Sequence, residues 1–201
     1  MKNPPVHWYQ GLFVRPQHLQ AADRHWSEAA HTSENWDHPY GYGVHDFSYS
    51  KDALASGHLR VEELDARLRD GTMIRLDAGQ ELEIDLKDAF DSQADRDNES
   101  TMMVYVAVPK LNLGGVNVSD DATNGTARYS RIQSNVMDEN GQDSGQAIEF
   151  RRLNVRLIIG DDQASGYEVL PIARIRSAGE RDVHPLVDEN YIPPILSTHS
   201  W

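Results

Sequence analysis

The chain has 201 residues and no cysteine, and its 32 acidic and 19 basic residues give it a formal net charge of −13. The missing thiols exclude disulfides, thiolate metal sites and cysteine nucleophiles, and the acidic balance disfavours binding to the phosphates of nucleic acid. The longest apolar run, 102–108, is far shorter than a membrane helix, which needs about 20 residues. The first residues lack the apolar segment of a secretory signal. We therefore expect a soluble, cytoplasmic protein.

The first predicted element is a helix over residues 16–30. Pro16 suits the first helical position, because the N–H that it lacks would have no partner there. An apolar stripe follows at spacings of three, four and three, which places its members on one helical face: Leu19, Ala22, Trp26 and Ala29. The next stretch, 36–43, contains Pro39 and two glycines, which break regular structure.

From residue 44 onward, apolar and polar residues alternate, which is typical of half-buried strands. The clearest unit joins 64–69 to 72–76 through Asp70-Gly71, a pair that favours a two-residue hairpin turn. The alternation slips at Glu62-Glu63 and at Arg151-Arg152, and each slip predicts a β-bulge. Further strands are predicted at 81–86, 101–109, 128–137, 167–176, 182–187 and 190–196.

Strand after strand behind one early helix indicates a mainly β fold, an antiparallel sandwich or an open barrel. The pattern excludes a doubly wound nucleotide-binding fold, because no βα units alternate. We expect an N-terminal aromatic segment with the short helix, 1–50, packed on a β-sandwich, 51–201, as one structural domain.

Motifs of the common hydrolases, NTPases, dinucleotide enzymes and zinc proteases are missing from the sequence, and we predict no enzymatic activity and no cofactor. One group has the residue types of a zinc site: His18, His25, Glu28 and His31. Two of its histidines are seven positions apart, about 10 Å along a helix, so we expect ordinary polar side chains instead.

Another group matches four positions of a calcium loop: Asp138, Asn140, Gln142 and Glu149. The glycine of the sharp turn is missing there, which favours a solvated hairpin loop.

Residues 8–16 concentrate large apolar side chains and one arginine in a short stretch. Two interpretations stay open. Trp8, Leu12 and Phe13 pack on the protein's own sheet, or part of the segment lies in a contact with another chain, where aromatic residues and arginine are enriched.

This segment, WYQGLFVRPQHLQ followed by Asp23-Arg24, resembles the opening of the TssK family, baseplate subunits of the bacterial type VI secretion system. That family reads W-x-E-G-M-F-L-x-P-Q-H-F-Q and then D-R. Later markers keep register: YGYGV at 40–44, LRDGT at 68–72, VAVP at 106–109, LPIAR at 170–174 and YIPP at 191–194. The departures are Gln10, Leu19 and Arg69, where the family has Glu, Phe and Pro.

The resemblance implies a non-enzymatic, homotrimeric adaptor whose N-terminal β-sandwich is similar to the shoulder domain of phage receptor-binding proteins. It implies that this part anchors the trimer to the TssF–TssG wedge. A helical neck and a C-terminal head, which we expect to be absent from this chain, would reach the membrane complex. The predicted contact residues are Trp8, Leu12, Phe13, Arg15, Pro16, Gln17, His18 and Leu19. The alternative is a ligand-binding sandwich without catalytic activity, in which Trp36, Tyr40 and Tyr42 of a loop stack on glycan rings.

Overall fold

The computed structural model of the chain describes residues 2–76, 80–91, 101–120, 126–140, 145–160, 164–177 and 184–196. The chain divides into two compact units, Met1–Tyr42 and Gly43–Trp201. The predicted boundary at 50/51 lies a few residues later than this division, and that the two parts pack as one structural domain stays a prediction. No helix in the described ranges is long and apolar enough to cross a membrane.

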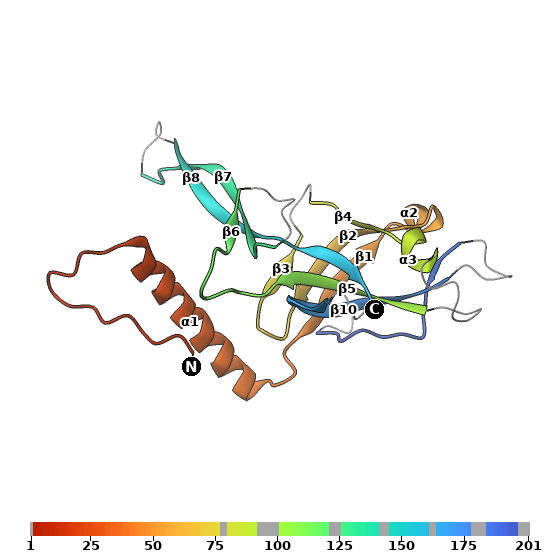
Figure 1. The fold of residues 1–201 in the computed structure, drawn as a ribbon, viewed down its shortest axis with the longest axis horizontal. Helices are drawn as coiled ribbons and strands as arrows, with labels where there is room; N and C mark the ends of the chain where they lie inside the picture. The colour runs from red at the N-terminus through yellow and green to blue at the C-terminus, as the bar shows by residue number, and fades with distance from the viewer. Residues whose placement is uncertain are drawn as a thin grey trace. The chain divides into compact units, whose positions relative to one another are not determined.

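The first unit consists of an extended segment and one helix, α1 (Pro16–Asp37) (Figure 1). The helix begins at the predicted proline but continues past residue 30, where the prediction ended it. Residues 31–37 lack a strong apolar pattern, yet nothing in them breaks a helix. Pro39 does, because a residue that precedes proline is disfavoured in the α conformation, and His38 accordingly caps the end with extended φ.

The extended segment returns along α1 and is tied to it at two places. Near its start, the backbone N–H groups of Lys2 and Asn3 donate to the Glu28 carboxylate at 2.5 and 2.7 Å. At the start of the helix, the Arg15 N–H donates to Nδ1 of His18 at 3.1 Å, and the His18 N–H donates to the Arg15 carbonyl at 3.0 Å. The residues between these ties therefore form a closed loop on the helix.

The second unit is a mainly antiparallel β-sandwich, as predicted. One sheet holds β1 (Gly43–Tyr49), β2 (His58–Arg67), β3 (Met73–Arg75) and β4 (Leu82–Asp85). The other holds β5 (Thr101–Pro109), β9 (Arg156–Ile159), β10 (Tyr167–Arg176) and β11 (Leu186–Val187). A third, smaller sheet holds β6 (Val118–Ser119), β7 (Tyr129–Met137) and β8 (Gly145–Leu153). Two short helices, α2 (Lys51–Ala55) and α3 (Lys87–Asp91), flank β2 and β4 in the sequence.

The core lies between the two four-stranded sheets. Alternate residues of both sheets are almost completely buried, among them Leu59, Leu64, Ile74, Val104, Leu170 and Ile172. In β5, which lies between β10 and β9, the residues 106–108 are buried in succession, so both faces of the strand are covered there. The apolar run that stood out in the sequence is thus a strand of the core.

The hairpin between β2 and β3 forms where predicted, but its turn is of another type. The Leu68 N–H donates to the Thr72 carbonyl at 2.9 Å, and the Gly71 N–H donates to the Leu68 carbonyl at 3.0 Å, which encloses a three-residue loop. Gly71 has φ +81°, whereas Asp70 keeps a negative φ. A turn followed by one left-handed glycine needs positive φ at one residue, while the predicted two-residue turn needs it at both.

One of the two predicted bulges is confirmed and the other is wrong. Ser48 pairs with Glu63 and Tyr49 with Val61, so Glu62 is the extra residue of β2. At Arg151-Arg152 the pairing of β8 with β7 runs without a shift. The alternation changes phase there because β8 ends at Leu153 and the chain passes to β9 in a different sheet.

The predicted strand at 190–196 is also wrong. Only Ile195 forms a bridge, a parallel one to Val44, because Pro193 and Pro194 have no N–H to offer a ladder. Of the predicted strand 182–187, the described residues form the short β11, and residues 182–183 lie outside the described ranges.

Candidate partner-binding surfaces

The predicted contact segment is exposed for most of its length. Phe13 is 76% exposed, Leu19 56% and Trp8 51%. Leu12 and His18 are half-buried, and Arg15, Pro16 and Gln17 are exposed. The segment therefore presents large apolar side chains beside a guanidinium group, which is the composition of an interface core.

A tight turn shapes the tip of this segment. The Leu12 N–H donates to the Tyr9 carbonyl at 3.2 Å, and Gly11 has φ +89°, a conformation that glycine adopts without steric cost. On either side of the turn, the Arg15 guanidinium lies 5.8 Å from the centre of the Phe13 ring, and the Trp8 and His18 rings are 6.3 Å apart. The cation–π contact orients the Arg15 charge at the edge of the apolar surface.

Three residues of the zinc-like group make separate contacts within the first unit, whereas Nδ1 of His31 is buried without a hydrogen-bond partner among the described residues, and the four do not converge. Glu28 accepts the two backbone N–H groups of Lys2 and Asn3, which lower the pKa of its carboxyl below the ordinary value. Nδ1 of His25 lies 2.9 Å from the Asn3 carbonyl and must donate to it. Nδ1 of His18 accepts from Arg15, so these side chains organise the loop and the helix.

In the described part of the chain, the residues that do converge with metal-ligand spacing are His45, Asp46 and Asp65 on β1 and β2. Asp46 accepts from Nδ1 of His45 at 2.5 Å, and Asp65 accepts from Nε and Nη2 of Arg75 at 3.1 and 2.5 Å. Asp65 is thus paired with Arg75 across β2 and β3, and Asp46 with its neighbour His45 within β1, an arrangement that no motif in the sequence indicates.

The calcium-like group belongs to the hairpin loop that was expected. The Asp138 carboxylate accepts the Asn140 N–H at 2.9 Å, a local turn, whereas Glu149 lies within β8 and Gln142 lies outside the described residues.

Of the aromatic residues proposed for glycan stacking, Trp36 lies in the last turn of α1 and not in a loop, which corrects that prediction. Tyr40 is exposed, and Tyr42 is half-buried.

A second surface, which the sequence analysis missed, is the two-stranded β7–β8 hairpin of the third sheet (Figure 1). Its strands are exposed along most of their length. Pairing places Ile132 opposite Phe150 and Ser134 opposite Ile148, so apolar side chains share one face. Arg131 on the other face bonds to Asp120 at 2.9 Å and to Glu149 at 3.3 Å. The alternation is visible in the sequence, where it predicts a strand of the sandwich with a bulge at Arg151-Arg152.

Two buried polar residues hold the root of this hairpin. Arg128, just before β7 and 5% exposed, donates to the Pro109 carbonyl at 2.7 Å, to Thr72 Oγ1 at 2.5 Å and to Asp70 Oδ2 at 3.1 Å. Asn154, just after β8, donates through Nδ2 to the Ala127 carbonyl at 2.8 Å. The turn after β2, the end of β5 and both ends of the hairpin are thereby joined.

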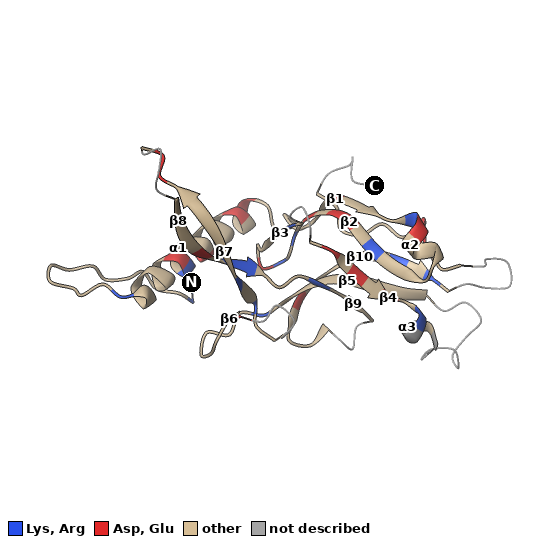
Figure 2. Ribbon diagram, turned by 90° about the horizontal axis from the view of Figure 1, so that it is seen from above, with Lys and Arg blue, Asp and Glu red and all other residues tan. Residues whose placement is uncertain are grey.

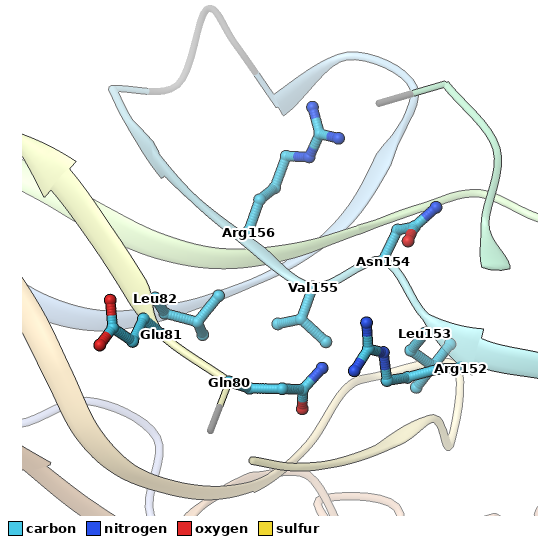
Figure 3. A pocket seen from close by; sticks show the side chains of 8 residues that line it. All are labelled: Gln80, Glu81, Leu82, Arg152, Leu153, Asn154, Val155 and Arg156. Atoms are coloured by element: carbon cyan, nitrogen blue, oxygen red, sulfur yellow. The ribbon is translucent and has the colours of Figure 1, made fainter. Parts of the chain in front are cut away.

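A depression of about 300 Å³ lies beside this root, between the start of β4 and the β8–β9 junction (Figure 3). Its lining residues are Gln80, Glu81, Leu82, Arg152, Leu153, Asn154, Val155 and Arg156. Arg156 points away from Gln80 and Arg152, and its guanidinium donates to the Tyr167 hydroxyl at 3.1 Å. The volume is at the lower end of the range for ligand sites.

A family model described as bacterial type VI secretion proteins of the EvfL, ImpJ and VasE type matches residues 18–200. The chain is 26% identical over 196 residues to the type VI secretion system baseplate component TssK1 of Pseudomonas aeruginosa, covering 96% of this chain and 42% of that protein.

Solved structures with the same fold include a crystal structure of TssK, with a TM-score of 0.82, 23% identity, and coverage of 97% of this chain and 43% of that one. A chain of the TssK-TssF-TssG baseplate subcomplex, determined by cryo-electron microscopy, has a TM-score of 0.83 and 22% identity, with coverage of 100% and 65%. The chain thus spans about two fifths of the curated relative and of the first of these structures.

Proposed function

Because this chain belongs to the bacterial type VI secretion family of the EvfL, ImpJ and VasE type, we propose that it is a structural baseplate module. The resemblance to TssK stated from the sequence is confirmed by the family match and by the curated relative. In this proposal the chain does no catalysis and acts in the cytoplasm. It joins the TssF–TssG part of the baseplate, and in its full form the adaptor is a homotrimer.

The observation that carries the anchoring role is the exposed segment Trp8–Leu19, which is also the stretch that resembles the family's opening. Phe13, 76% exposed, and Trp8 would each remove a large apolar area from water on docking. Arg15 beside them would add directional hydrogen bonds at the rim of the contact. The ties of the loop to α1 reduce the entropy that binding must remove.

The test is co-purification of the chain with a TssF–TssG complex of the same bacterium, followed by light-scattering mass measurement. Phe13→Ala and Trp8→Ala should each weaken binding at least about tenfold, as expected for a central anchor. Tyr40→Ala is the matched control, because Tyr40 is an 83% exposed aromatic residue outside the segment.

Thermal unfolding of each variant separates the two open interpretations of the segment. An unchanged melting temperature with lost binding supports a partner contact. A lowered melting temperature in Phe13→Ala would show that the ring packs within the chain, and equal binding by all three variants would contradict the anchoring role.

A further inference from the structure

The depression beside the hairpin root is lined by two segments of the second unit, the start of β4 and the β8–β9 junction. Leu82, which is buried, and Val155, which is half-buried, supply apolar side chains to its wall. The side chains of Gln80 and Arg152 point toward one another beside Val155 (Figure 3). The space between them therefore combines an apolar wall with an amide and a guanidinium group.

Arg152 is half-buried, and it makes no hydrogen bond, ion pair or ring contact with the described residues. Its pairing partner on β7 is Ser130, which is neutral, and the carboxylate of the lining residue Glu81 is exposed and points away from it (Figure 3). Arg128 and Arg174, by contrast, each have a carboxylate partner. A charge that loses part of its water without gaining a partner is destabilising. The described part of the second unit therefore supplies no anion to this guanidinium.

The chemistry of the depression favours a carboxylate over a phosphate. The planar fork of a guanidinium matches a carboxylate, which accepts two of its N–H groups at once. Figure 2 shows the basic residues of the described strands interspersed with acidic ones, in a chain with a net charge of −13, so a multiply charged phosphate would be repelled around the depression. The apolar wall and the volume of about 300 Å³ suit a side chain with its neighbours in a peptide segment.

We propose that this depression binds an acidic side chain carried by an apolar segment of a partner protein, with Arg152 as its counter-charge. The apolar neighbours of that side chain contact Leu82 and Val155. An unpaired charge in a half-buried place is typical of a binding site, where stability is given up for function. The site belongs to the second unit and shares no residue with the segment Trp8–Leu19, so it does not depend on the anchoring role proposed for that segment.

The first test titrates the peptide N-acetyl-Leu-Glu-Leu-amide into the isotope-labelled chain and follows it by nuclear magnetic resonance. We expect saturable shifts of the N–H signals of residues 80–82 and 152–156 and of the Nε–H signal of Arg152, with a dissociation constant of about 1 mM. N-acetyl-Leu-Gln-Leu-amide is the matched control. It should bind at least about tenfold more weakly, because a hydrogen bond to a charged group contributes more than one between neutral groups.

The second test changes the guanidinium. Arg152→Gln should weaken binding of the glutamate peptide at least about tenfold, and Arg152→Lys should give an intermediate loss, because an ammonium group keeps the charge without the planar fork. Arg151→Gln is the matched control and should leave binding unchanged. Arg151 is the next residue on β8, it is exposed on the opposite face, and its guanidinium lies 5.0 Å from the centre of the Tyr129 ring.

Stability without peptide distinguishes a binding site from a contact within the chain. Arg152→Met keeps the volume of the stem and removes a charge that has no partner among the described residues, so the urea midpoint should stay unchanged or rise. A lower midpoint would show that the guanidinium already has a partner in its own chain, in either unit, and would overturn the inference.

Three other results would also overturn it. The first is the absence of a saturable shift with the glutamate peptide up to about 20 mM. The second is equal binding of the glutamate and glutamine peptides. The third is saturation of the same signals by inorganic phosphate at a lower concentration than by the glutamate peptide.

Discussion

Substitution of Arg128 by methionine tests how the hairpin root is held. Methionine fills the volume of the stem but removes the guanidinium, which makes three hydrogen bonds, to the Pro109 carbonyl, Thr72 and Asp70. The Pro109 carbonyl would lose a buried partner, and the Asp70 side chain, 30% exposed, would keep only part of its solvation. Removing one partner of a buried pair costs 3–5 kcal/mol, so we expect the free energy of unfolding to fall by about 3 kcal/mol.

The assay is urea unfolding followed by circular dichroism, with the slope compared between variants to confirm that the change lies in stability. Arg131→Met is the control, because Arg131 lies three residues further along, in β7, and pairs with Asp120 and Glu149, but its side chain is 46% exposed. Exposed pairs contribute roughly 0.2–1 kcal/mol. Equal losses in the two variants, or a loss below about 1 kcal/mol for Arg128→Met, would refute the assignment of Arg128 as the tie of the root.

Three further outcomes are expected. Gly43→Ala should lower the free energy of unfolding by about 2 kcal/mol in thermal unfolding, because Gly43 has φ +145° and an added Cβ would lie 2.7 Å from the Pro194 carbonyl oxygen. Gly160 has φ +77° but open space around it, so Gly160→Ala should lower the free energy of unfolding by only about 1 kcal/mol. Asn154→Ala should cost about 1.5 kcal/mol by the same assay, because it leaves the buried Ala127 carbonyl without its side-chain donor. The backbone N–H groups of Lys2 and Asn3 lower the pKa of Glu28 below its ordinary value, so their protection from amide exchange should be present at neutral pH and lost as the pH falls through that lowered pKa. Glu28→Gln should weaken this protection at pH 7 and remove its pH dependence.

The strands of the sandwich core could be predicted from sequence, because burial on one or both faces requires apolar residues at alternate or successive positions. The predicted strands 101–109 and 167–176 agree with β5 and β10 to the residue, since inward positions there are apolar throughout. The bulge at Glu62 was visible for the same reason: an extra residue resets which positions face the core.

Where no core face exists, the same signal misleads. Ile148 and Phe150 alternate with polar residues as a core strand does, yet β8 is exposed, and the alternation marks an amphipathic hairpin instead. Nor does any local pattern show that Arg128 reaches residues more than fifty positions away, at Asp70 and Thr72. From sequence alone, a charged residue is predicted to lie at the surface, because its tertiary partners are not known until the fold is.

The two units differ in what stabilises their folded structure. The second unit has a buried core and buried polar ties, and it needs no further surface to account for its fold. Helix α1 is long, but none of its residues is buried, and most helices in water depend on packing of an apolar face. Its two tryptophans, Trp26 and Trp36, are 70% and 81% exposed, and they extend the exposed aromatic surface of the first unit beyond the segment Trp8–Leu19.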